Sequence, residues 1–234
     1  MRKKIPIIYK DKDILVCEKP IGMSIQSDKS NNLDVISQLK KDLYLEENLS
    51  EEPYLAAVHR LDRPVGGLTV LARNQEAAAN LSRQIQEHEF EKDYQAVICG
   101  ELPEEVGTFE DYLLHDTRTN QTRVVPEGTK GAKYARLDYE LIDEIESKQG
   151  LLAWVLIHLE TGRHHQIRVQ FASRHLPLYG DAKYNKAFQK QKKYTQLALY
   201  STRIAFDHPK TKEHLVYKTD PQGDGFDAMD VEAY

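Results

Sequence analysis

The sequence predicts an α+β protein with a mainly antiparallel sheet. Most recognisable segments are short runs of apolar, aromatic and β-branched residues, which are typical of strands, and few segments have helical spacing. The helical segments fall irregularly among the strands instead of following each one, as in α+β folds and unlike parallel α/β folds. At 234 residues, the chain is long enough for one large domain or two small ones.

The expected strands are of two kinds. Residues 135–141 alternate at period two, with Ala135, Leu137 and Tyr139 in phase, as in a half-buried strand. Residues 151–158 form an apolar run that suits a central strand. Further strands are expected at residues 14–17, 68–71, 94–98, 196–206 and 214–217.

Helices are expected in three segments. Residues 33–43 have helical spacing, with one face made of Leu33, Ile36, Leu39, Lys40 and Leu43. Asn74 is expected to cap a second helix, because its side chain can accept a hydrogen bond from the first turn. That helix has one face made of Ala77, Ala78, Leu81 and Ile85. A short helix over residues 166–174 is expected to place Ile167, Gln170, Phe171 and Arg174 on adjoining faces.

No linker or repeat divides the pattern, so we expect one domain over residues 1–219. Residues 220–234 are rich in Asp and Gly and are expected to form a loosely packed acidic tail. No apolar run approaches the ~20 residues of a membrane span, and the N-terminal segment has no signal-peptide core. Cys17 and Cys99 lie in apolar surroundings and are expected to be buried thiols. We therefore expect a cytoplasmic monomer without a membrane partner.

The charge is unevenly distributed. The net charge of −5 excludes a protein that coats nucleic acid by bulk positive charge. Acidic residues concentrate in runs at 46–52, 101–111 and 138–146, which look like solvated faces. Residues 159–214 reverse the balance, with eleven Lys and Arg against four Asp and Glu. This segment is therefore a candidate for salt-sensitive binding of phosphate groups, with Lys190, Lys192 and Lys193 as the residues to test.

Three short segments concentrate residues that can do chemistry. In HRLDRPVGGL, Asp62 lies between Arg60 and Arg63, and opposite charge favours the ionised carboxylate. Proline and paired glycines indicate a tight loop. Such a carboxylate can be a nucleophile, a general base or a metal ligand, and the alternative is an exposed loop salt bridge.

The segment 161–185 combines Arg163, Arg168 and Arg174 with histidines and hydroxyls, which suits contacts with phosphates and bases. The alternative is a solvated basic surface. Adjacent His164 and His165 cannot both face one metal ion from a regular element, so we expect no metal site there.

The segment EKDYQAVICG is expected to be a strand. Lys92 and Tyr94 lie two residues apart and therefore point to the same face. Tyr94 is either a core residue or a stacking platform for an aromatic base.

These segments resemble motifs of the RluA-type pseudouridine synthases. HRLDRPVGGL, EKDYQAVICG and TGRHHQIRVQ occur in the order and approximate spacing of that family. ILVCEKPIGMSIQS, LPLYGDAKYN and LALYSTRIAFDHP extend the resemblance over residues 14–217. It implies the pseudouridine synthase catalytic fold with a central RNA-binding cleft. It also implies isomerisation of specific uridines in structured RNA, either rRNA or tRNA. No cofactor is expected, because the reaction involves no net redox change.

The resemblance also implies roles for individual residues. Asp62 matches the catalytic aspartate, Tyr94 the tyrosine that packs on the uracil, and Arg168 the basic residue that pairs with the aspartate. Ile167 matches the apolar residue beside it, and Arg60 an arginine that helps to flip the target base into the site. The other RNA-binding candidates in the matched segments are His59, Arg163 and His165.

The chain departs from the family pattern at two places. Gly66-Gly67 stands where Thr/Ser-Gly is common, and His164 stands where Thr or Ser is usual. Because the catalytic segment begins near residue 14, we expect no S4-like domain of the kind that some members carry at the N-terminus. Whether Asp62 attacks C1′ or removes a proton from C2′ stays open.

Two rival functions remain. One is a catalytically silent RNA-binding or chaperone protein on the same scaffold, which would have no chemical need of Asp62. The other is a glycoside or nucleoside hydrolase, which would need a second positioned carboxylate.

Overall fold

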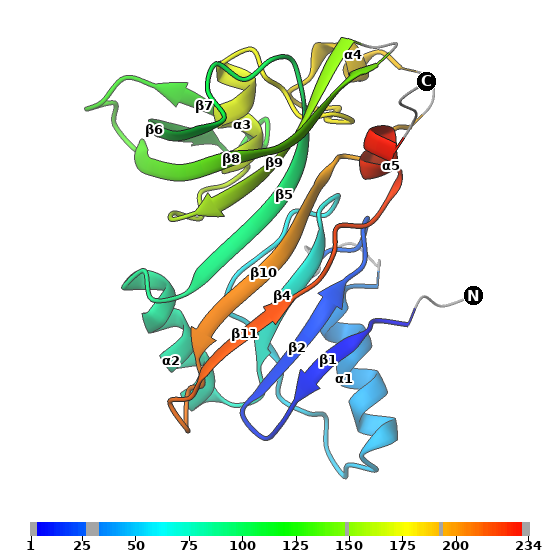
Figure 1. Cartoon of the computed structure of the whole chain (residues 1–234). Coiled ribbons are helices and arrows are strands. Elements are labelled where there is room, and N and C mark those ends of the chain that lie inside the picture. The colour runs from blue at the N-terminus through cyan, green and yellow to red at the C-terminus, as the bar shows by residue number, and fades with distance from the viewer. Residues whose placement is uncertain (1–3, 27–32, 148–149, 192–193, 231–234) are drawn as a thin grey trace. The chain divides into compact units, whose positions relative to one another are not determined.

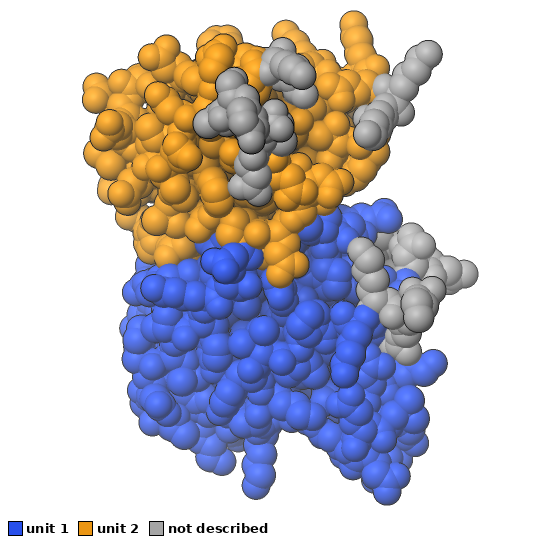
Figure 2. Space-filling model, turned by 45° about the vertical axis from the view of Figure 1, so that its right-hand side comes forward, with its two compact units in different colours: residues 1–91, 201–220 blue, residues 92–200, 221–234 orange. Residues whose placement is uncertain are grey.

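The computed structural model describes residues 4–26, 33–147, 150–191 and 194–230 (Figure 1). The chain divides into two compact units, coloured separately in Figure 2. Unit 1 comprises residues 1–91 and 201–220, and unit 2 comprises residues 92–200 and 221–234. The expectation of one domain over residues 1–219 therefore stays a prediction. No helix among the described residues is long and apolar enough to span a membrane.

Unit 1 is a sheet with the strand order β1–β2–β4–β10, to which β3 and β11 add by pairing with β4 and β10 (Figure 1). Every strand pair of the unit with a described register is antiparallel. The strands are β1 (Ile7–Lys10), β2 (Ile14–Lys19), β3 (Ala56–Ala57), β4 (Gly66–Ala72), β10 (Leu199–Asp207) and β11 (His214–Lys218).

Two helices cover opposite faces of this sheet, because β2 alternates between two apolar clusters. Leu15 and Cys17 pack with α1 (Val35–Glu46). Ile14 and Val16 pack with α2 (Gln75–Gln86) in the other cluster. This alternation follows from the period of two in a strand. Unit 1 therefore has helix, sheet and helix layers, with its core on both faces of the sheet.

The helix caps decide where these helices begin. Asn74 accepts a hydrogen bond from Ala77 N, which confirms the predicted cap of α2. Asp34 caps α1 by accepting from Ser37 N, so α1 begins at Val35. The predicted start at Leu33 is wrong, because that residue precedes the cap and is exposed. The buried face is made of Val35, Ile36, Gln38, Leu39 and Leu43, while Lys40 is only partly buried.

Unit 2 has the antiparallel strand order β5–β9–β8–β6–β7. The strands are β5 (Glu91–Cys99), β6 (Val106–Asp116), β7 (Gln121–Val125), β8 (Lys133–Ser147) and β9 (Gly150–Leu159). α3 (Gln166–Ser173) packs through Val169 against Leu113 of β6 and Ala135 of β8. The predicted fold class, α+β with a mainly antiparallel sheet, is confirmed.

Unit 2 also differs from the sequence prediction. The acidic segment that includes residues 106–111 forms β6, and alternate residues at the start of this strand are exposed. The strand was not predicted because its exposed acidic residues look like a solvated surface in the sequence. The C-terminal residues form α5 (Asp224–Asp230), after the short α4 (Lys186–Gln189). Phe226 is buried against the Trp154 and Tyr200 rings, so the described part of this segment is not a loosely packed tail. Cys17 is buried, whereas Cys99 is only partly buried, and both are free thiols.

Gly67 at the start of β4 allows close approach of β10. Its φ is +113°, and a Cβ there would lie 2.2 Å from the carbonyl oxygen of Ser201. We expect Gly67→Ala to lower the free energy of unfolding by about 3 kcal/mol or more, from positive-φ strain plus overpacking. Chemical denaturation measures the loss.

The matched control is Gly128→Ala. Gly128 also has a positive φ, +80°, but no atom lies within 4 Å of its Cβ position. It should lose only about 1–2 kcal/mol, the cost of strain alone. Equal losses in the two variants would contradict the close-approach argument.

Candidate active site

Asp62 lies on a short turn between β3 and β4 of unit 1. Leu61 and Val65 on either side of it are buried and anchor the turn in the core. The Val65 amide donates to the carbonyl oxygen of Asp62 at 3.0 Å, which closes the turn. The Asp62 side chain itself is half-buried. The turn therefore presents one carboxylate from a well-anchored backbone.

Lys19, the last residue of β2, is hydrogen-bonded to this turn. Its ammonium donates to the carbonyl oxygens of Pro20 (3.0 Å), Met23 (2.6 Å) and Arg63 (3.2 Å). The side chain has no exposed surface. Lys19 also pairs in register with Gly67, the second residue of β4, which follows the Asp62 turn. The side-chain nitrogen of one buried lysine thus joins the turn after β2 to the turn that carries Asp62.

Direct backbone contacts strengthen that connection. The Gly22 amide donates to the Arg63 carbonyl oxygen at 2.9 Å, and Arg63 Nε donates back to the Gly22 carbonyl oxygen at 3.0 Å. Burial lowers the pKa of Lys19 to about 7, although the negative charge of Asp62 acts in the opposite direction. The lysine is therefore electrostatically coupled to the candidate catalytic group.

Sequence analysis missed Lys19 as a functional candidate. A signal was present, because Lys19 is in phase with Leu15 and Cys17, the β2 residues that face the α1 core. A lysine that continues an inward-facing register is rarely buried without a partner.

The other unit 1 candidates flank Asp62. His59 Nε2 accepts a hydrogen bond from Val70 N at 3.3 Å, so its neutral ring carries the proton on Nδ1. The ring also packs on Phe90, with centroids 5.3 Å apart. Arg60 is exposed. His59 is thus held against the strand and core, while Arg60 is accessible at the surface.

Tyr94 lies on β5 in unit 2, opposite Ile157 of β9. It is 6% exposed, and so is Lys92, which confirms that the two side chains share the buried face of β5. Burial lowers the pKa of Lys92. Ile167, on α3, is also buried. The unit 2 candidates therefore combine buried apolar and aromatic surface with a desolvated ammonium group.

Arg168 makes a two-pronged ion pair with Asp181. Arg168 Nε and Nη2 donate to the two carboxylate oxygens at 2.8 and 2.7 Å. Asp181 is only 1% exposed and was not among the predicted site residues. The predicted pairing of Arg168 with Asp62 stays a prediction, since a guanidinium has five N–H donors and can serve several acceptors.

Tyr184 connects the remaining candidates. Its hydroxyl is 2.7 Å from His165 Nδ1, and the guanidinium carbon of Arg168 lies 5.3 Å from the centre of its ring. His165 occupies the N-cap position of α3 with a positive φ of 52°, and its side chain makes no capping hydrogen bond. Arg163 Nε donates to the carbonyl oxygen of Tyr134. The structure thus brings Arg168 and His165 to one tyrosine and ties Arg163 to β8.

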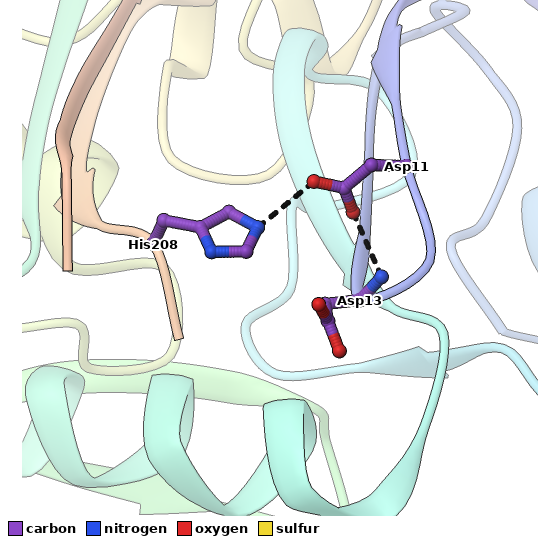
Figure 3. Close-up of side chains that lie close together, drawn as sticks. All are labelled: Asp11, Asp13 and His208. Carbon is purple, nitrogen blue, oxygen red and sulfur yellow. Dashed lines mark hydrogen bonds and ion pairs between the residues drawn. The ribbon is translucent and has the colours of Figure 1, made fainter. Parts of the chain in front are cut away.

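The described residues contain one acidic and histidine cluster with metal-ligand spacing, made of Asp11, Asp13 and His208 (Figure 3). His208 Nδ1 accepts from the amides of Lys210 and Thr211, so its Nε2 carries the proton and donates to Asp11 at 2.9 Å. Neither ring nitrogen then offers a lone pair to a metal. The cluster instead joins the turn after β1 to the turn after β10.

Comparison with known proteins identifies the family. The family model described as RNA pseudouridylate synthase matches residues 13–173, a span that contains Asp62, Tyr94 and Arg168. The human protein RNA Pseudouridylate Synthase Domain Containing 4 has the same fold. Its solved structure matches with a TM-score of 0.78 and 19% identity, covering 96% of this chain and 92% of that one.

Two bacterial relatives agree. A ribosomal large subunit pseudouridine synthase C of Buchnera aphidicola subsp. Schizaphis graminum is 30% identical, over 92% of this chain and 67% of that protein. A tRNA pseudouridine synthase C of Vibrio parahaemolyticus is 29% identical, over 92% and 89% respectively. Such proteins are isomerases that act on RNA. This chain belongs to the RNA pseudouridylate synthase family, which confirms the resemblance found in its motifs.

The buried Lys19 predicts a pH dependence of stability. From about pH 7 to 10 the folded protein holds Lys19 neutral, whereas the unfolded chain binds a proton there, so unfolding becomes less favourable as pH rises. Relative to Lys19→Met, wild-type stability should rise by up to about 1.4 kcal/mol per pH unit.

Urea denaturation across that pH range measures the difference. The control is Lys12→Met, because Lys12 is exposed and its replacement should leave the pH dependence unchanged. Parallel stability curves for wild type and Lys19→Met would contradict the lowered pKa.

Proposed function

We propose that the chain converts a uridine of structured RNA, in rRNA or tRNA, to pseudouridine, with Asp62 as the catalytic carboxylate. The observation that carries this is the Asp62 turn, which lies in the family-matched span and is anchored by Leu61, Val65 and the Lys19 hydrogen bonds. A catalytic group must be held in one geometry to react efficiently, and this turn meets that requirement.

The reaction breaks the C1′–N1 bond, turns the detached uracil and joins C1′ to C5. The C5 proton is then lost and N1 gains one, so atoms and electrons balance without a co-reactant. Asp62 either attacks C1′ or takes a proton from C2′. Tyr94 supplies an aromatic face for the base, Ile167 excludes water beside it, and Arg168 provides positive charge to keep a carboxylate ionised.

The target base must leave its stack before it can react. Arg60 is suited to fill the gap, because it is exposed and lies two residues from Asp62. His59, Arg163 and His165 are proposed to contact the surrounding RNA. We propose that a monomer carries out this reaction, and its RNA substrate and two free thiols suit a reducing cytoplasm.

The role of Asp62 predicts a sharp separation between chemistry and binding. Asp62→Ala and Asp62→Asn should abolish pseudouridine formation on unmodified tRNA and rRNA transcripts, while RNA affinity stays within about threefold. Pseudouridines are mapped by chemical adducts and primer stops. Glu51→Ala, at an exposed position, is the control and should keep full activity.

The same assay separates the rival functions. RNA retention without product from the wild-type protein would indicate a binding protein, and free uracil would indicate a hydrolase. Residual turnover in Asp62→Ala would refute the assignment of Asp62.

The basic segment at residues 159–214 is proposed to contact phosphates. The structure reduces its charge, since Arg168, Arg174 and Arg203 are paired with Asp181, Asp111 and Glu91. Lys190 is exposed, whereas Lys192 and Lys193 lie outside the described residues. The lysines, more than the arginines, are therefore the candidates for RNA contacts.

Replacing Lys190, Lys192 and Lys193 together with Ala should weaken RNA binding. Three lost phosphate contacts should reduce the slope of log affinity against log salt by about 2. Filter binding at several salt concentrations measures it. The matched control replaces the exposed Lys4, Lys12 and Lys41 of unit 1. An equal effect in the two triple variants would exclude a specific role for this cluster.

A further inference from the structure

Asp181 is a buried carboxylate that contacts Arg168, one of the proposed catalytic residues. Its side chain is fully buried, and the Arg168 side chain is 7% exposed. Two parallel N–H···O bonds at 2.8 and 2.7 Å fix the plane of the guanidinium as well as its position. A pair of this kind restrains Arg168 far more tightly than a single hydrogen bond or a solvated contact would.

Asp181 is itself held rigidly. Its Oδ1 also accepts the amides of Lys183 at 2.8 Å and Tyr184 at 3.1 Å, so the carboxylate closes its own turn. The preceding Gly180 has a φ of +74°, and a Cβ there would lie 1.9 Å from the carbonyl oxygen of Gln196. The turn therefore has little freedom to shift Asp181.

The chain leading to Asp181 is attached to β5, the strand that carries Tyr94. The Cys99 amide donates to the Pro177 carbonyl oxygen at 2.9 Å, and the Tyr179 amide donates to the Val97 carbonyl oxygen at 2.8 Å. Hydrogen bonds to β5 thus hold the segment that ends at Asp181, and Asp181 in turn orients Arg168. The orientation of Arg168 is therefore fixed relative to the strand that carries Tyr94.

The charge state of Asp181 suits this arrangement. Burial opposes ionisation, but the Arg168 ion pair and the two backbone amides outweigh it and lower the pKa of the carboxyl. Arg168 therefore has a permanent counter-charge within unit 2. The guanidinium has further N–H donors, so Arg168 can meet a second carboxylate while the Asp181 pair keeps its orientation.

We propose that Asp181 is a positioning residue that holds the Arg168 guanidinium in the orientation that uridine isomerisation requires. The inference rests on the proposed function. It assigns Asp181 an effect on the rate of the chemical step, exerted through Arg168, and none on RNA recognition.

The primary test is Asp181→Asn. Asparagine has nearly the same size and can still accept the Lys183 and Tyr184 amides, but it lacks the charge and the second acceptor oxygen for Arg168. Single-turnover conversion of an RNA substrate should slow by about 10- to 100-fold, the effect of a misplaced group near the reacting atoms. The Kd for RNA should change by less than about threefold.

A matched control separates positioning from general destabilisation. Asp111 pairs with Arg174, the residue at the end of the same helix, at 2.8 Å. Asp111→Asn removes a second two-contact aspartate–arginine pair, which is more exposed than the Asp181 pair, and should lower the melting temperature without slowing conversion by more than about twofold. A rate loss in Asp111→Asn equal to that in Asp181→Asn would overturn the inference.

The double variant tests whether Asp181 acts through Arg168. Arg168→Gln alone should slow conversion, and Arg168→Gln combined with Asp181→Asn should be no slower, since the orienting contact is already lost. Multiplicative losses would overturn the inference. If Asp181→Asn fails to fold, Arg168→Lys replaces it, because lysine keeps the charge but lacks the planar fork. A wild-type rate in Arg168→Lys would also overturn the inference.

The outcomes distinguish the two proposals. A wild-type protein that converts no uridine in tRNA or rRNA would refute the proposed function and the inference with it. Normal conversion by both wild type and Asp181→Asn would refute the inference alone.

Discussion

The candidate site of unit 1 depends on the hydrogen bonds that the buried side-chain nitrogen of Lys19 donates to backbone carbonyl oxygens. A lysine in a dry core costs free energy unless its donors are satisfied, and here three backbone carbonyl oxygens satisfy them. Because the carbonyl oxygens belong to two separate turns, neither turn can move without leaving a buried donor unsatisfied. The geometry of the Asp62 turn is therefore coupled to the stability of the unit 1 core.

Unit 2 also buries a basic side chain, but its partner is a carboxylate and not a set of backbone carbonyl oxygens. Its buried cation, Arg168, is matched by an anion, Asp181, and that carboxylate is satisfied by two further amides. A complete buried ion pair contributes little net stability compared with apolar packing, but losing one partner is costly. Such a pair is better explained by the orientation it imposes on Arg168 than by the stability it adds.

Much of the fold and of the site follows from local sequence patterns. Apolar patterns and the Asn74 cap predicted β2, β4, β5, β8, β9, β10 and β11 and the helix α2, but not β1, β3, β6 or β7. The Asp62 segment was found because several unusual residues are adjacent in sequence. Lys19 and Asp181 were missed because their roles depend on partners 44 and 13 residues away. No local pattern shows which arginine a given aspartate will meet. The strand β6 was missed because its exposed positions include charged residues such as Glu110 and Asp116, which resemble a solvated loop in the sequence.

His164, which departs from the family pattern, is accommodated by contacts with residues of unit 2. Its ring stacks on His115 of β6 with centroids 3.9 Å apart, and its Nδ1 lies 2.9 Å from the Thr122 hydroxyl of β7. Those contacts hold His164 against the β6–β7 hairpin. The His164 ring also contacts the neighbouring His165 ring, with centroids 3.7 Å apart. His165 Nδ1 in turn lies 2.7 Å from the hydroxyl of Tyr184, whose ring also packs on Arg168. The two histidines therefore connect the β6–β7 hairpin to Arg168 on α3 through a series of ring contacts. The positive φ of His165 places this contact at the point where the chain enters α3.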